Sequence, residues 1–193
     1  MARKDFDLIT EWVEPDSRIL DLGCGDGSLL KLLNKKRNTS GYGVDTSIDK
    51  TIKSLDNTIN IINADINDHM DFFKDKSFDY VILAQSLQVV DNPVSLIKEM
   101  LRIGNEVIIS FPNMGYWRSR LYLFFRGEMP VTSELPFSWH STPNIHLCTI
   151  RDFKKMCISN NFQITEEVIN NINGKNISAS LLNNLTGTSA IFR

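Results

Sequence analysis

Short apolar runs alternate with amphipathic stretches along the first part of this chain. The apolar runs are short enough to be buried strands, and they occupy residues 19–20, 41–45, 60–64, 78–84 and 106–111. Between them, residues 28–33 carry leucines on one helical face, while Asn92 and Pro93 are typical of a helix cap and first turn. The buried stripe of that second helix is predicted to be Leu96, Ile97, Met100 and Leu101. This alternation predicts an α/β fold with a Rossmann-like, doubly wound sheet that is mostly parallel.

The chain becomes less regular after the last of these runs. Residues 116–126 would be apolar around most of a helix, with arginines interleaved, and residues 127–147 contain three prolines with little periodicity. We therefore interpret residues 112–148 as an insertion that either caps the ligand edge or docks a partner protein. In the second case, Trp117 and Arg120 are expected to contact the partner. A core helix with snorkelling arginines is the structural alternative for residues 116–126.

The end of the chain predicts one more helix and two strands. Thr149 is expected to cap the helix, with Asp152 near the capping-box position. Inside it, Phe153 and Met156 are expected to be buried. Residues 162–168 and 187–192 follow as predicted strands, and two late strands joined by a loop would form an antiparallel edge of the sheet.

Length and composition are those of one globular domain. The 193 residues are 42% hydrophobic and 23% charged, so we expect a single domain over residues 1–193. A formal net charge of −2 gives no reason to expect a nucleic acid partner. The three cysteines form no C-x-x-C pair, no stretch is long and apolar enough to span a membrane, and the first residues lack a signal-peptide pattern. We therefore expect a reduced, cytoplasmic protein with no membrane partner.

The richest chemistry lies between the first strand and the following helix, in residues 21–27, which read DLGCGDG. Glycines permit positive φ and let backbone N–H groups approach a ligand closely. The three glycines are Gly23, Gly25 and Gly27. Their spacing is not that of the dinucleotide fingerprint G-x-G-x-x-G, and Asp21 and Asp26 would repel a pyrophosphate but not a sulfonium or ammonium. The turn therefore favours S-adenosyl-L-methionine (SAM), or its product S-adenosyl-L-homocysteine, over NAD or ATP.

Further polar residues follow the other predicted strands. Asp45 ends the second strand, where an acceptor-only carboxylate can bind both ribose hydroxyls, and Thr46 is next to it. Asp65 follows the third strand and could accept the adenine amine, with Ile66 donating from its backbone; a turn-forming role for Asp65 stays equally open. Gln85 follows the fourth strand at the carboxyl edge, where ligands bind. The predicted cofactor site is therefore Asp21, Gly23, Gly25, Gly27, Asp45, Thr46, Asp65, Ile66 and Gln85.

The catalytic residues, if there are any, stay unknown. Tyr116, His140 and His146 could each act as a base, but each could equally be structural. His140, His146 and Cys148 have poor spacing for metal ligands, so we expect no metal site. Residues 84–87, AQSL, stand where an N/D-P-P-Y-type amine-binding motif would lie, which disfavours N-methylation of nucleobase or amide amines.

The chain resembles the class I SAM-dependent methyltransferases. The resemblance rests on the D-x-G-x-G-x-G turn, Asp45 and Asp65, and it implies a seven-stranded sheet whose last strand is antiparallel. A narrower similarity is to the MetW family of bacterial methionine-biosynthesis proteins, which more often have Glu at the position of Asp45. The matching stretches are residues 18–27, 78–83, 110–113, 129–132 and 142–153.

The MetW resemblance implies a function in methionine biosynthesis. It implies a SAM-binding protein that acts with a homoserine O-acyltransferase, as an accessory or regulatory subunit. It does not supply a methyl acceptor. The alternative is therefore a SAM-dependent methyltransferase whose small-molecule acceptor enters under residues 112–148.

Overall fold

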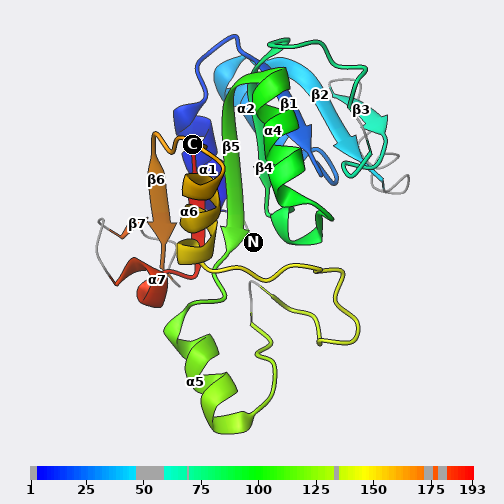
Figure 1. Cartoon of the computed structure of the whole chain (residues 1–193). Helices are drawn as coiled ribbons and strands as arrows, with labels where there is room; N and C mark the ends of the chain where they lie inside the picture. Colours follow the sequence, from blue (N-terminus) through cyan, green and yellow to red (C-terminus); the bar gives the residue numbers. More distant parts are fainter. Residues whose placement is uncertain (1–3, 47–58, 69, 133–134, 172–175, 178–181) are drawn as a thin grey trace. The chain divides into compact units, whose positions relative to one another are not determined.

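The computed structural model forms two compact units, drawn in Figure 1. The residues that it describes are 4–46, 59–68, 70–132, 135–171, 176–177 and 182–193. The first unit comprises Met1–Ser86 with Val90–Ile109, and the second comprises Leu87–Val89 with Ser110–Arg193. Strand β5 (Gly104–Pro112) begins in the first unit and ends in the second. Each unit is described below by itself.

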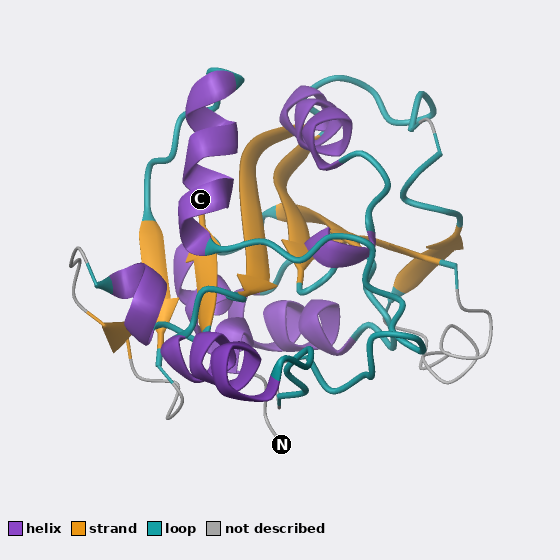
Figure 2. Ribbon diagram, turned by 60° about the horizontal axis from the view of Figure 1, so that its bottom comes forward, coloured by secondary structure: helices purple, strands orange, loops and turns teal. Residues whose placement is uncertain are grey.

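Parallel strands form the centre of the first unit (Figure 2). They are β1 (Arg18–Leu22), β2 (Ser40–Asp45), β3 (Asn60–Asn63) and β4 (Phe78–Ala84). Strand β1 pairs in parallel with both β2 and β4, and β2 pairs in parallel with β3. Residues Tyr80–Ala84 are buried without interruption, as expected for a central parallel strand that is covered on both faces. The predicted strand over residues 78–84 is therefore confirmed.

The helices described in this unit are α1 (Lys4–Trp12), α2 (Ser28–Arg37) and α4 (Pro93–Ile103). Helix α4 begins as predicted, because the Asn92 side chain accepts a hydrogen bond from the Ser95 backbone N–H at 3.0 Å and Pro93 occupies the first turn. Its buried stripe was predicted correctly except at one position. Leu101 is exposed and Ile103 is buried instead, because residues 96, 100 and 103 follow the helical repeat that faces the sheet.

The described elements of the second unit are more varied. In chain order they are the 3₁₀ turn η1 (Leu87–Val89), α5 (Trp117–Arg126), α6 (Ile150–Ser159), β6 (Glu167–Asn170), β7 (Asn176–Ile177), α7 (Asn183–Thr186) and β8 (Ser189–Phe192). Strand β8 pairs antiparallel with β6, which confirms the antiparallel pair of late strands. The predicted strand over 162–168 was wrong for residues 162–166, which are irregular because the partner strand β8 ends at Phe192, opposite Glu167.

The described strands form a sheet of eight in the order β3-β2-β1-β4-β5-β8-β6-β7. Its members β3 to β5 have the doubly wound order, and β8 lies inside the sheet between β5 and β6. The predicted fold class, a mostly parallel sheet with an antiparallel last strand, is therefore confirmed. Strand β7, which is last in the sheet order, has only two residues and lies at the edge.

Helix α6 and β8 enclose an aromatic core in the second unit. The rings of Phe111, Phe153 and Phe192 are mutually packed, with centroid separations of 4.7–5.8 Å. The predicted capping box is confirmed, because the Thr149 side chain accepts from the Asp152 N–H while the Asp152 carboxylate accepts from the Thr149 N–H. These contacts fix the start of α6 against the end of β5.

The buried amide of Asn113 makes four hydrogen bonds that join its own loop, the start of α6 and the end of α7. Its Nδ2 donates to the carbonyls of Asn184 and Gly187 at 3.1 and 2.8 Å, and its Oδ1 accepts from the N–H groups of Gly115 and Ile150 at 2.9 and 3.2 Å. Every hydrogen-bonding position of the amide group that can be filled inside the core is therefore used. None of the described helices is long and apolar enough to cross a membrane.

Candidate cofactor site

The candidate site lies at the carboxyl ends of β1, β2 and β4. The strand order reverses beside β1, and such a switch point is where doubly wound sheets bind ligands. The glycine turn is tied to the end of β2, since the N–H groups of Gly23 and Cys24 donate to the Val44 carbonyl at 2.8 and 3.1 Å. Ser86, just beyond β4, also lies next to the glycine turn, since a Cβ built on Gly23 would be 2.6 Å from the Ser86 Oγ.

All three glycines of the turn have left-handed backbone conformations. Their φ angles are 68° at Gly23, 59° at Gly25 and 72° at Gly27, which L-residues with a Cβ rarely adopt. The turn leads directly into α2, whose first N–H, on Ser28, donates to the Asp26 carboxylate at 3.1 Å. The predicted glycine-rich strand–turn–helix unit is therefore present.

Gly25 differs from its neighbours because it faces open space. A Cβ built on Gly25 would meet no atom within 4 Å, whereas one on Gly27 would be 3.1 Å from the side chain of Ile59. The absence of a side chain at residue 25 thus leaves room beside a half-buried stretch of backbone. This is the arrangement expected where a ligand approaches the main chain.

Asp45 reaches back to this turn. Its Oδ2 accepts a hydrogen bond from the Gly25 N–H at 2.7 Å. A carboxylate offers about four acceptor positions, so this bond is compatible with further bonds to ribose hydroxyls. The structure therefore brings Asp45 and the glycine turn together, while the adjacent Thr46 is exposed.

The site has a negative electrostatic potential. The pKa of the Cys24 thiol is raised to about 12, first by burial and then by the carboxylates of Asp21 and Asp45, with a smaller contribution from Asp26. Asp26 itself has a lowered pKa, chiefly because the Ser28 hydroxyl donates to it, so it is charged at neutral pH. Burial says nothing about a ligand's charge, but the three carboxylates around Cys24 disfavour a phosphate and favour a cation.

The remaining predicted residues occupy different settings. Asp21 is 2% exposed on β1, in register with Gly43 of β2. Asp65 is exposed, and its Oδ1 accepts from the Asn67 N–H at 2.9 Å, which confirms the turn-forming role that was open for it. The contact of Asp65 with adenine stays a prediction. The contact of the buried Ile66 with adenine also stays a prediction. Gln85 has a left-handed backbone with φ of 60°.

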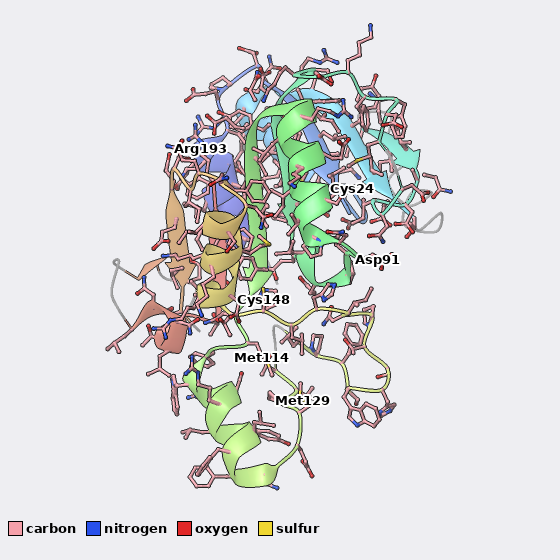
Figure 3. The ribbon with its side chains drawn as sticks, viewed as in Figure 1. Cys24, Asp91, Met114, Met129, Cys148 and Arg193 are labelled. Carbon is pink, nitrogen blue, oxygen red and sulfur yellow. The ribbon has the colours of Figure 1, made fainter. Side chains whose placement is uncertain are left out.

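Two residues near the turn were not predicted. Cys24, which is labelled in Figure 3, is buried. A Cβ on Gly43 of β2 would be 2.4 Å from the Cys24 Sγ. Gly43 therefore makes room for Cys24, and the Gly-Tyr-Gly sequence in the second strand was the signal that could have indicated this packing. Ser86 carries no such signal, since its position depends on the pairing of β1 with β4.

The three candidate bases all belong to the second unit. Tyr116 is buried, and His140 and His146 are exposed. The His140 ring packs edge-on against Trp139, with the centroids 5.6 Å apart. No group of three or more His, Cys, Asp or Glu side chains is placed to hold a metal ion within the described ranges. A catalytic role for any of the three stays a prediction.

A family model described as "Methionine biosynthesis protein MetW" matches residues 3–193. The chain belongs to the MetW family. A relative from Rhodopirellula baltica, the bifunctional methionine biosynthesis protein MetXA/MetW, is 36% identical over 197 residues, which cover 97% of this chain. This MetW-family chain spans only 32% of that relative's length.

Two further similarities concern methyltransferases. The demethylmenaquinone methyltransferase of Staphylococcus carnosus is 30% identical over 134 residues, covering 64% of the chain and 56% of that enzyme. The crystal structure of a SAM-dependent methyltransferase from Mesorhizobium loti superposes with a TM-score of 0.70 at 14% identity, over 99% of this chain and 97% of that one. Because the sequence identity is so low, the superposition concerns the fold alone, and it shows that the MetW-family chain has the class I methyltransferase fold.

Proposed function

We propose that this protein is a SAM-binding accessory subunit of a homoserine O-acyltransferase in methionine biosynthesis. The observation that carries the proposal is the relative in which MetXA and MetW form one polypeptide, since its MetW part aligns with nearly the whole of this chain. Two activities joined in one chain are held at a high effective concentration. The separate chain is then expected to bind its partner directly.

The charge and shape of the glycine turn support SAM as the ligand. The open space at Gly25 would take the ligand against the backbone, and Asp45 would accept from the ribose hydroxyls. Asp65 and Ile66 would hold the adenine edge, and Gln85 would complete the site beyond β4. The carboxylates that raise the Cys24 pKa suit a positively charged amino-acid nucleoside and oppose a pyrophosphate. When bound, SAM supplies a methyl group activated on a sulfonium.

A regulatory role follows from the chemistry of the ligand. SAM is made from methionine, so its occupancy of this site would report the level of the pathway's product to the acyltransferase. Such coupling is reciprocal: the acyltransferase must change the affinity for SAM by the same factor as SAM changes the affinity for the acyltransferase. Coupling energies between sites are typically about 1–3 kcal/mol, or roughly 5- to 150-fold in affinity.

The test is a thermodynamic cycle measured by calorimetry. SAM is titrated into the chain with and without saturating acyltransferase, and the acyltransferase is titrated with and without SAM. NAD and ATP serve as control ligands. We expect SAM binding, no binding of either control, and at least a fivefold change on both arms of the cycle. Equal SAM affinities in the two titrations would contradict the regulatory role.

The partial similarity to a demethylmenaquinone methyltransferase favours a second candidate, a methyltransferase acting on a small-molecule acceptor. Its test is the release of labelled methyl from SAM over a panel of metabolites. Turnover by the purified chain without any acyltransferase would establish this candidate and overturn the accessory role.

A further inference from the structure

Helix α5 exposes a run of five consecutive apolar residues, Leu121–Phe125. Phe124 is 79% exposed and Phe125 is 74% exposed, and their rings lie edge to face with centroids 5.1 Å apart. Ser119 is the one side chain of α5 that is buried among the described residues. The alternative that residues 116–126 form a core helix is therefore wrong.

This surface is comparable to the largest apolar patch of a typical monomer, and such patches are often functional. An aromatic side chain can bury roughly 200 Å², so Phe124 and Phe125 together expose about 300 Å². The largest apolar patch on a typical monomer is itself only about 300–600 Å². Leu121, Tyr122 and Leu123 add to it with exposures of 40–45%. Because five consecutive helical residues point in all directions around the axis, a flat surface would cover only some of them. An enclosing protein groove fits better.

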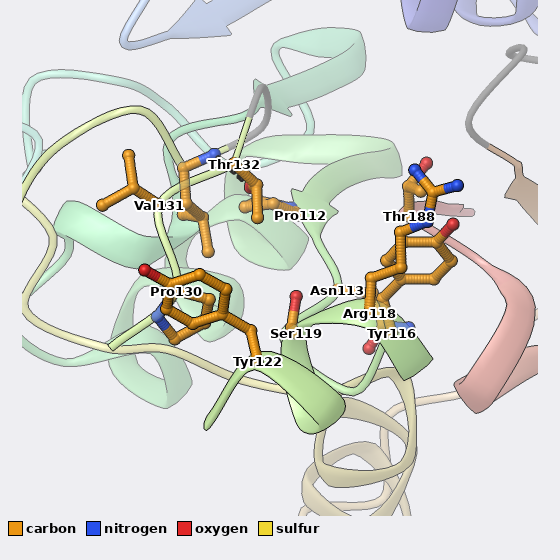
Figure 4. Close-up of a pocket in the computed structure, with 11 residues that line it drawn as sticks. Pro112, Asn113, Tyr116, Arg118, Ser119, Tyr122, Pro130, Val131, Thr132 and Thr188 are labelled. Carbon is orange, nitrogen blue, oxygen red and sulfur yellow. Dashed lines mark hydrogen bonds between the residues drawn. The ribbon is translucent and has the colours of Figure 1, made fainter. Parts of the chain in front are cut away.

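A cavity of about 280 Å³ lies beside the same helix (Figure 4). It separates α5 from the segment that follows it, and its lining includes Ser119, Tyr122, Pro130, Val131 and Leu135. The Tyr122 ring and Val131, both partly exposed, lie at this cavity. Interface hot spots are typically large side chains that fill such pockets. The volume suits one large apolar side chain from a partner.

The charge around α5 distinguishes between occupants. Arg118 and Arg126 flank the apolar run, and within the described ranges Arg126 has no acidic partner. Glu128 is the nearest acid in sequence, and it accepts a hydrogen bond from the Tyr122 hydroxyl at 3.3 Å. A second copy of this chain would meet α5 through the same patch, which places arginine against arginine. A partner with an apolar groove and an acidic rim has the complementary charge.

We infer that α5 and the cavity beside it form the surface that binds the homoserine O-acyltransferase. The acyltransferase contributes an apolar anchor side chain to the cavity and an acidic rim to the arginines. This inference rests on the proposed function, from which it takes the partner's identity. It refines the expectation for residues 116–126, because Phe124 and Phe125 are far more exposed than Trp117.

Arg120 is a poor residue for testing this surface. Its Nε donates to the Gly115 carbonyl at 2.6 Å, so it holds the start of α5 in place. Replacing it would change the helix as well as the surface. Phe124 and Phe125 carry no such structural role.

The experiment measures binding of the purified acyltransferase from the same genome by calorimetry. The test variant is Phe124→Ala/Phe125→Ala. The matched control is Ile158→Ala on α6, an apolar side chain that is 76% exposed on another helix of the same unit. A second variant, Ser119→Leu, fills the cavity without touching the exposed rings, and urea unfolding reports whether each variant is folded. We expect about 100-fold weaker binding for the double variant, at least tenfold for Ser119→Leu, and less than twofold for Ile158→Ala.

Each outcome separates this inference from the function on which it rests. Wild-type binding that is unchanged by the double variant and by Ser119→Leu would overturn the inference and leave the proposed function in place. No binding by the wild-type chain would overturn the proposed function itself. A wild-type dimer in sedimentation, abolished by the double variant while acyltransferase binding persists, would show that a second copy covers α5 and would also overturn the inference.

Discussion

Gly25 provides the sharpest test of the cofactor site. The change to Ala adds a Cβ that meets no protein atom within 4 Å, so packing does not oppose it. The backbone does, because φ at this position is +59° and a left-handed alanine costs about 1–2 kcal/mol. If the open space belongs to SAM, the new methyl also occupies the ligand's position. We therefore expect at least tenfold weaker SAM binding, equivalent to about 1.4 kcal/mol.

Gly127 supplies the matched control. It ends α5 with φ of +67°, and a Cβ there also meets nothing within 4 Å. Gly127→Ala should therefore lose the same free energy of unfolding as Gly25→Ala while keeping wild-type SAM affinity. Urea unfolding measures the first quantity and calorimetry the second. Gly23→Ala should be less stable than either, because its Cβ would be 2.6 Å from the Ser86 Oγ.

Two results would refute this reasoning. SAM binding by Gly25→Ala within twofold of wild type would show that the open space is not the ligand's. An equal loss of SAM affinity in Gly127→Ala would show that the effect comes from stability rather than from the site.

Four further predictions concern single residues. Asp45→Asn should weaken SAM binding at least tenfold, whereas Asp45→Glu should retain it; calorimetry compares the two. Asn113→Asp turns two donors into acceptors that face carbonyls, so urea unfolding should show a loss of about 3 kcal/mol or more, and an unchanged midpoint would exclude the role given to this amide. Thr149→Ala removes a cap and should cost about 1 kcal/mol in the same assay, with Ser as the control that keeps it. The Cys24 pKa is about 12 in the folded chain against 9.0 ordinarily, so between these values the unfolded chain releases a proton that the folded chain keeps. Stability should therefore fall as pH rises above 9, by about 1 kcal/mol at pH 10 for this thiol, and Cys24→Ala should reduce that slope.

Local signals made much of the first unit predictable. Strand β4 matches its nearly continuous apolar run from Phe78 to Ala84, which Asp79 alone interrupts, because a central parallel strand is buried on both faces. The start of α4 was predictable from its first turn alone. There the Asn92 side chain binds one free backbone N–H, and Pro93 has no N–H that would need a partner. The glycine turn was predictable because its left-handed φ angles require glycines, which are visible in its own sequence.

The predictions from sequence were wrong at positions whose structure depends on tertiary contacts. Residues 162–166 have a strand-like pattern, yet β8 ends opposite Glu167 and gives them no partner strand, and register of this kind is not visible in one strand's sequence. Met156 is only half-buried, because Phe153 and Cys157 occupy the face of α6 that meets the core. In the site, the bond between Asp45 and Gly25 joins residues twenty positions apart and could not be predicted from either one.

The buried amide of Asn113 has a consequence for how the second unit folds. Its two acceptor carbonyls lie 71 and 74 positions further along the chain, and β8, which follows them, is an interior strand of the sheet. Contacts so distant in sequence form slowly, because a long loop must close before any of them is made. During translation, α5 and α6 would therefore emerge well before the segment that locks them in place. Assembly of this unit is completed only when β8 has been synthesised.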